Sequence, residues 1–300
     1  MIRIIYFLIL FVFLSCSNNH INFERATIYV KGQEIEILTA YGIFDNYLLN
    51  KKSYYRNVYQ KIESEFKENA EYPFLLETIK KDIKPDESVK EEILLLKQYD
   101  ISNIVDSAFQ KIIPELPGPK TKILFILANP EYRDLYRQYK VGMAAITVGA
   151  GKIIVSIDPT SIYWKEQLPY VLAHEYHHSV WTSRNFTTAD LTPLEYLVLE
   201  GKADSFAKNL FPDTEFPHTK VMDENKERFV WDLIKPELNN RKSNMNDLMM
   251  MGNEDIPRCS GYTIGFNMVE LFKRNYQTAI DSLIIDIEPE QILLLSKYDE

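Results

Sequence analysis

The spacing of apolar positions along the chain changes twice, and each change predicts a different kind of element. A β-hairpin is expected first, because the segments 27–30 and 34–38 flank a Lys-Gly-Gln turn. Apolar side chains then recur every three or four residues, which is typical of amphipathic helices. The expected helices cover residues 55–66, 73–83, 87–98 and 102–113. Pro114 is expected to end the last of them.

The apolar period shortens to that of β-strands between residues 122 and 157. Residues 122–128 form a short apolar run, and residues 144–148 and 152–157 flank a Gly-Ala-Gly turn. From Pro169 onward the pattern is mainly helical again. The chain is therefore expected to be an α+β protein, with a helical N-terminal region, a small mixed sheet and a mainly helical C-terminal half.

A short segment rich in Pro and Gly, residues 114–119, is the best internal boundary in the sequence. It separates a predicted hairpin and helical region, residues 27–113, from a predicted domain of residues 120–300.

The N-terminus differs from the rest of the chain. Residues 4–14 are uninterruptedly apolar after Arg3, which is too short for a membrane span but suits a secretory signal. The following Ser-Cys pair resembles the lipobox of bacterial lipoproteins. That resemblance implies removal of residues 1–15, lipidation of Cys16 and a tether over residues 16–26, so we expect an extracytoplasmic protein with a lipid anchor in the membrane. A plain signal peptide or an uncleaved anchor are the alternatives.

Composition and charge exclude several classes of protein. Hydrophobic residues make up 46% and charged residues 26% of the chain, which excludes a disordered or collagen-like protein. The net charge of -9 disfavours nucleic-acid partners, because binding phosphates needs clustered Lys and Arg. Two cysteines cannot form a disulfide framework.

One motif in the helical half carries metal chemistry. Residues 174–178 read His-Glu-Tyr-His-His, an H-E-x-x-H pattern typical of zinc metalloproteases. Positions four apart lie on one side of a helix, so His174 and His178 can bind the same ion. Glu175 can hold a metal-bound water and accept its proton. His177 is expected to be structural, and the alternative for the motif is a pair of hydrogen-bonded surface histidines.

A third ligand is expected on the following helix. Thr192 and Glu195 form a capping box, which accounts for Glu195 without a metal. Glu200 then becomes the candidate ligand, and Asp204, one turn later, can accept a hydrogen bond from a ligand histidine. A solvated acidic helix face is the alternative for this pair.

At these residues the chain resembles the gluzincin class of zinc peptidases. More closely, it is similar to the bacterial YjaZ-like family of predicted Zn-dependent proteases, formerly a domain of unknown function. The matching segments are HEYHH at 174–178, LEGKAD at 199–204 and GYTIGF at 261–266. The resemblance covers roughly residues 100–300 and implies a zincin-like fold, one Zn²⁺ per chain and peptide or protein substrates.

These observations predict a zinc-dependent peptidase in which His174, His178 and Glu200 leave the fourth metal position open to water. Tyr262 is the candidate for stabilising the oxyanion, although it could equally be a core residue, and His218 is a second candidate. Extended substrates commonly pair with an edge strand beside the cleft. The residues nominated for that strand are Ala144, Ala145, Ile146, Thr147 and Val148.

Two other functions stay open at this stage. The chain could be a non-catalytic surface lipoprotein with a structural zinc site, which requires a fourth protein ligand. Cys259, His177 or His218 could supply that ligand. The chain could also be a zinc hydrolase that acts on an amide outside peptides.

Overall fold

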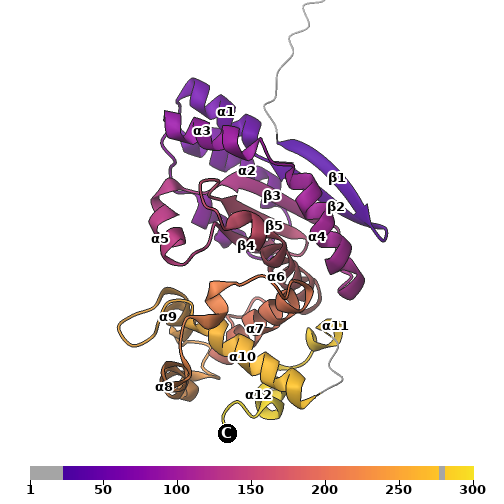
Figure 1. The fold of residues 1–300 in the computed structure, drawn as a ribbon, viewed down its shortest axis with the longest axis vertical. Helices are drawn as coiled ribbons and strands as arrows, with labels where there is room; N and C mark the ends of the chain where they lie inside the picture. The colour runs from indigo at the N-terminus through magenta and orange to yellow at the C-terminus, as the bar shows by residue number, and fades with distance from the viewer. Residues whose placement is uncertain (1–22, 277–280) are drawn as a thin grey trace, which may run out of the picture.

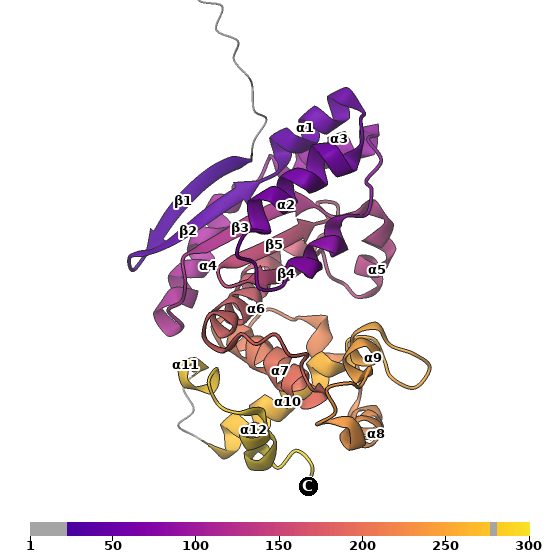
Figure 2. The same cartoon turned by 180° about the vertical axis from the view of Figure 1, so that it is seen from behind.

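The computed structural model describes residues 23–276 and 281–300. It confirms the expected α+β class: a five-stranded sheet with its helices forms one half, and a bundle of helices forms the other (Figure 1). The view from behind shows α6 and α7 between the sheet and the C-terminal helices (Figure 2). Cys16 and the predicted signal segment lie outside the described residues.

The sheet combines two antiparallel hairpins with parallel pairings in its centre. Its strands are β1 (Glu24–Val30), β2 (Gln33–Thr39), β3 (Thr121–Leu127), β4 (Met143–Gly149) and β5 (Lys152–Ile157), in the order β1-β2-β3-β5-β4. β2 and β5 run parallel to β3, whereas β4 runs antiparallel to β5. The nominated substrate strand is therefore an edge strand of this sheet.

Helices of the N-terminal half cover the sheet (Figures 1 and 2). They are α1 (Tyr41–Asn50), a π-helical turn (Tyr55–Tyr59), α2 (Gln60–Phe66), a 3₁₀ helix (Pro73–Ile79), α3 (Glu87–Leu96), α4 (Ile101–Glu115), a 3₁₀ turn (Pro130–Tyr132) and α5 (Arg133–Gln138). The expectation that Pro114 ends α4 was wrong, because the helix continues two residues past the expected end at residue 113, to Glu115. Proline lacks an N–H but keeps a helical φ, and Leu116 still donates to the Ile112 carbonyl, so the last turn closes around it.

Helices make up the C-terminal half. They are α6 (Trp164–Asn185), α7 (Pro193–Leu210), a 3₁₀ helix (Pro217–Lys220), α8 (Glu224–Ile234), a 3₁₀ turn (Lys235–Glu237), α9 (Met245–Met251), α10 (Ser260–Asn275), α11 (Asp281–Ile284) and α12 (Pro289–Ser296). Pro169 was expected near the start of α6 but lies inside it, because the helix begins at the fully buried Trp164. Within the described residues, no helix has the length and apolarity needed to cross a membrane.

Two large clusters of buried apolar side chains hold most of these elements together, and a small third one lies at α5. The larger cluster joins the sheet to α1–α4 and α6, and the smaller one lies among α7, α8, α10 and α12. Because β2 pairs directly with β3, both the sheet and the larger cluster extend across the segment 114–119. The division into domains at that segment stays a prediction.

Candidate metal centre

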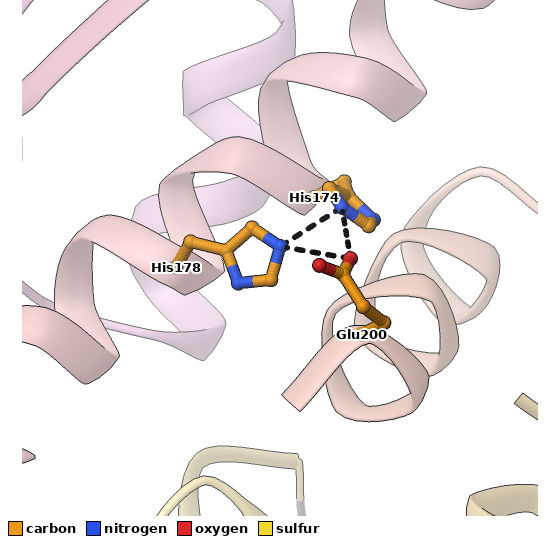
Figure 3. Close-up of side chains that lie close together, drawn as sticks. All are labelled: His174, His178 and Glu200. Atoms are coloured by element: carbon orange, nitrogen blue, oxygen red, sulfur yellow. Dashed lines mark hydrogen bonds and ion pairs between the residues drawn. The ribbon is translucent and has the colours of Figure 1, made fainter. Parts of the chain in front are cut away.

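Two neighbouring helices bring three metal-ligating side chains to one point (Figure 3). His174 and His178 lie on successive turns of α6, and Glu200 projects from α7. The Nε2 atoms of the histidines are 3.0 Å apart, and Glu200 Oε2 lies 3.3 Å from His174 Nε2 and 3.2 Å from His178 Nε2. These three side chains form a group of potential ligands whose donor atoms all lie within 4.8 Å of one another.

The triangle of donor atoms fits a zinc ion. Ligand atoms about 2.0–2.1 Å from a tetrahedral Zn²⁺ are about 3.3 Å from one another, close to the spacing of these three. His174 Nδ1 lies 3.0 Å from Asp204 Oδ1. Since an ionised carboxylate only accepts hydrogen bonds, this contact places the proton of the neutral imidazole on Nδ1 and leaves the Nε2 lone pair facing the triangle.

Asp204 is itself held in position on α7. Its side chain is fully buried, and Oδ1 also accepts a hydrogen bond from the hydroxyl of Tyr170 at 3.0 Å. Tyr170 lies one turn before His174 on α6, so the phenol and the imidazole reach the carboxylate from the same helix. The sequence analysis missed Tyr170, although its place four residues before His174 predicts a shared helix face.

Glu195 has the structural role that its position predicts. Thr192 Oγ1 accepts from the Glu195 N–H, and Glu195 Oε2 accepts from the Thr192 N–H at 2.7 Å, which completes a capping box at the start of α7. Arg241 binds the same carboxylate. Glu195 is therefore engaged at the helix start, more than one turn before Glu200.

A close contact between α7 and α10 sets the position of Glu200. A Cβ atom on Gly201 would lie 2.1 Å from the Gly265 carbonyl oxygen, and a Cβ on Gly265 would lie 2.0 Å from the Leu197 carbonyl oxygen. Only glycine permits backbones to approach this closely. The residue after Glu200 thus packs directly against α10.

The charges of the centre are coupled. Burial alone raises the pKa of the Glu200 carboxyl, but the charge of His178 and hydrogen bonds from both histidines outweigh it and lower the pKa overall. Burial lowers the pKa of His174. The charges of Asp204 and Glu200 and their hydrogen bonds raise it by more, so the pKa is well above its usual value. The site therefore favours an ionised Glu200 carboxylate next to positive charge, and a divalent cation would supply such a charge.

Glu175 lies beside the triangle and is held from the sheet. Its side chain is buried, and its Oε2 lies 2.7 Å from the hydroxyl of Thr147 on β4. The same hydroxyl is 2.8 Å from the Glu175 carbonyl oxygen. The nominated strand residue Thr147 therefore contacts the candidate base, a role that the sequence analysis did not assign to it.

The other candidate residues have distinct positions. Tyr262 lies in the first turn of α10 with its ring centroid 6.1 Å from that of His174, and the His218 ring is 5.5 Å from Tyr262. His177 is buried against Phe206, and burial lowers its pKa well below the usual value. Among the described residues, His177, His218 and Cys259 are not part of the ligand group.

A cavity of about 320 Å³ opens in front of the triangle. His174, Glu175, His178, Glu200 and Tyr262 line it together with Ala145, Ile146 and Thr147 of β4. At the end of the strand, the Val148 carbonyl accepts a hydrogen bond from the Tyr72 N–H, so this part of the edge is already paired.

Comparison with known proteins agrees with this geometry. A protein-family model described as "Predicted Zn-dependent protease (DUF2268)" matches residues 101–294, which include every residue of the candidate centre. The chain is also similar to the uncharacterized protein YjfC of Bacillus subtilis (strain 168), with 26% identity over 218 residues that cover 66% of this chain and 71% of that protein. No solved structure matches the chain.

Proposed function

The chain belongs to the DUF2268 family of predicted Zn-dependent proteases, and from this premise we propose that it hydrolyses peptide bonds at the centre formed by His174, His178 and Glu200. The observation that carries the proposal is the triangle of donor atoms with a carboxylate, Glu175, next to it in the same cavity. Two histidines on one helix and a glutamate on the next is the arrangement of gluzincin peptidases, which the chain resembles.

The three metal ligands and Glu175 are proposed to have separate roles in the reaction. A zinc ion bound there would lower the pKa of a bound water to about 7 and polarise the scissile carbonyl. Glu175 is the group that takes the proton from the attacking water and returns it to the leaving amine. Asp204 keeps the His174 proton on Nδ1, so that Nε2 stays available as a ligand.

Tyr262 and His218 are proposed to stabilise the developing oxyanion. Both side chains line a hollow that also contains His174 and Glu175. Burial lowers the pKa of His218 to about 4, so its imidazole is neutral at physiological pH and can donate one hydrogen bond. Burial raises the pKa of Tyr262 well above the usual value, so the phenol keeps its proton and is also a donor.

The edge of β4 is the proposed binding strand for the substrate backbone. The Gly142 carbonyl accepts from the Asp158 N–H, so Gly142, Ala144 and Ile146 face β5, up to the register shift between Thr147 and Gly149. The N–H and C=O groups of Ala145 therefore face the open edge, where a peptide can add as a further strand.

Lipidation of Cys16 is proposed to hold this peptidase outside the cytoplasmic membrane. The support comes from the apolar segment and the Ser-Cys pair that follows it. Metabolic labelling with a radioactive fatty acid tests this anchor, because a Cys16→Ala variant should carry no label.

The decisive experiment compares the wild type with Glu175→Gln, a substitution that removes the base without touching the three ligands. The variant is expected to keep about one zinc per chain but to lose about 100- to 10,000-fold in kcat on an unfolded protein substrate. Metal analysis and a chelator-treated wild type provide the controls. Unchanged turnover by Glu175→Gln, or no cleavage by the zinc-loaded wild type, would contradict the proposal.

A further inference from the structure

The cavity at the metal centre continues along β4 into two further hollows. A hollow of about 280 Å³ shares His174, Glu175, Ala145 and Ile146 with the first cavity. A hollow of about 470 Å³ shares Ala144, Ala145 and Ile146 with the second one and extends over residues of β3 and β5. All three spaces are lined by Ala145 and Ile146 of β4, and we call them together the β4 groove.

Arg258 lines both of the further hollows, and no carboxylate in the described part of the chain pairs with it. Among the arginines of residues 23–276 and 281–300, only Arg133 and Arg258 are half-buried, and the others are exposed. Arg133 forms an ion pair with Glu92, whereas no carboxylate of the described residues lies within 4.0 Å of the Arg258 guanidinium. The Cys259 thiol is a hydrogen-bond partner of this guanidinium, which has five N–H donors and can therefore also bind an anionic ligand.

The backbone next to Arg258 is in an unfavourable conformation. Cys259 has φ 63° and ψ 19°, the left-handed region that non-glycine residues seldom adopt. Its buried side chain lines the same hollow as Arg258. Such conformations cost free energy and cluster at ligand-binding sites. The chain thus keeps a strained turn at the point where Arg258 enters the groove.

Among the described residues, lysine and arginine line only one end of the β4 groove. The first cavity is lined by no lysine or arginine among the described residues. The 470 Å³ hollow contains Arg258 and Lys81, and Lys81 is already paired with Glu131. Arg258 is therefore the cation that distinguishes one end of the groove from the other.

The direction of β4 determines which part of a bound substrate would lie near Arg258. An extended peptide that adds to the edge in the more stable antiparallel orientation runs opposite to β4, from Thr147 towards Ala144. Its residues after the scissile bond then lie in the 280 Å³ hollow, which Met143, Ala144 and Arg258 line.

We propose that Arg258 binds a substrate carboxylate on the C-terminal side of the scissile bond. This inference rests on the proposed peptidase function and adds a substrate class to it. The carboxylate can belong to the C-terminus of the peptide or to an Asp or Glu side chain. Either can accept two parallel hydrogen bonds from the planar guanidinium, and the apolar walls of the groove strengthen the ion pair.

The test measures binding in the absence of turnover. Zinc-loaded Glu175→Gln protein is immobilised and equilibrated with acetylated octapeptides of random Ala, Leu, Phe and Ser, made as free acids and as C-terminal amides. Mass spectrometry quantifies what is retained. Free acids are expected to bind about tenfold or more tightly than amides. A second pair of amidated libraries, with one internal Asp or with Asn in its place, separates a side-chain carboxylate from a terminal one.

Substitution of the arginine supplies the specific readout. In the same Glu175→Gln background, Arg258→Gln should abolish the preference for carboxylates, Arg258→Lys should keep part of it, and Arg56→Gln, an exposed arginine of the N-terminal region, should leave it unchanged. Equal binding of acids and amides together with equal binding of the Asp and Asn libraries overturns the inference, as does a preference that survives Arg258→Gln.

Cleavage by the wild type distinguishes failure of the Arg258 proposal from failure of the proposed peptidase function. If the wild type cleaves acids and amides equally well and also shows no Asp preference, then Arg258 has no such role but the peptidase function stands. If carboxylate-dependent binding occurs without any cleavage by the zinc-loaded wild type, the binding site stands and the proposed hydrolysis does not.

Discussion

At the scale of single residues, the candidate base is attached to the strand on which the substrate is proposed to bind. The Thr147 hydroxyl contacts both the carboxylate and the carbonyl of Glu175. A peptide that pairs with β4 would therefore lie along a strand that also positions the proton acceptor. Small displacements of such a group are costly for the rate, because proton transfer requires near-contact geometry.

Removing this hydroxyl should affect turnover rather than metal binding. We expect Thr147→Val, which keeps the β-branched shape, to lower kcat about 10- to 100-fold while KM changes little and zinc content stays the same. Thr147→Ser restores the hydroxyl and should recover most of the rate. Steady-state kinetics with metal analysis measures this, and a parallel loss of zinc in Thr147→Val would show a structural role instead.

The buried imidazole of His218 predicts a dependence of stability on pH. Its folded-state pKa is about 4, whereas an unfolded histidine titrates near 6.5. As the pH falls from about 6.5 to about 4, the unfolded chain gains a proton that the folded chain does not bind, so the free energy of unfolding decreases. The contribution of the neutral His218 to the free energy of unfolding is therefore fully present above about pH 6.5 and is lost as the pH falls towards about 4.

His218→Phe should reduce that loss, because a phenylalanine suits the neighbouring rings of Phe216 and Tyr262 and cannot titrate. Urea unfolding at pH 7 and pH 4.5, with chelator in both samples, measures the change. Between pH 7 and pH 4.5, we expect the free energy of unfolding of the wild type to fall by about 2 kcal/mol more than that of the variant. Identical losses would mean that His218 is accessible to protons in the folded state.

At the scale of elements, the metal centre depends on how three helices approach one another. α6 supplies two ligands and α7 the third, while α10 presses against α7 at the residue after Glu200. The helix pair α7–α10 is packed backbone to backbone at Gly201 and Gly265. The ligand carboxylate thus has a position determined by a helix contact that itself contains no metal ligand.

Adding a methyl group at this contact should separate the helices. Gly265→Ala and Gly201→Ala each place a Cβ against a carbonyl oxygen, which cannot move away, and should lower the free energy of unfolding by about 2 kcal/mol or more. Zinc affinity should fall as well, because Glu200 shifts with the helix. Gly261→Ala is the comparison, since its Cβ would meet the Tyr196 ring at 2.8 Å and a side chain can adjust. Equal stability of all three variants in chemical unfolding would contradict this explanation.

At the scale of the whole molecule, the N-terminal region and the candidate centre share one core. β2 pairs in parallel with β3, and α4 packs on α6, the helix that carries His174 and His178. The family match begins at residue 101 and so leaves out β1 and β2, which nonetheless complete the sheet. Residues before 114 therefore support the helix that holds the two histidines.

A chain that begins at residue 120 should not fold by itself. It would expose the β3 edge and the apolar face of α6 that α4 covers. We expect circular dichroism and thermal unfolding of residues 120–300 to show no cooperative transition, whereas residues 23–300 should unfold cooperatively. A cooperative transition for the shorter chain would instead support the domain division predicted at the Pro- and Gly-rich segment.

The sequence by itself determined what depends on local spacing. Four-residue spacing on a helix places His174 and His178 on one face, and the capping box explains Glu195, because the helical period and the first-turn geometry are the same in every context. The apolar runs and the turns between them predicted the strand ends within one residue, except that β1 begins three residues earlier than expected, at Glu24. Such features need no knowledge of distant parts of the chain.

Only the tertiary structure decided which distant residues meet. That Thr147 reaches Glu175, that Tyr170 reaches Asp204 and that Arg258 lines the β4 groove all follow from how strands and helices pack. The pairing of β2 with β3 was likewise invisible in the spacing of either strand. Contacts between elements depend on packing angles and on which apolar faces bury each other, and a periodic pattern specifies that a face is buried without specifying against what.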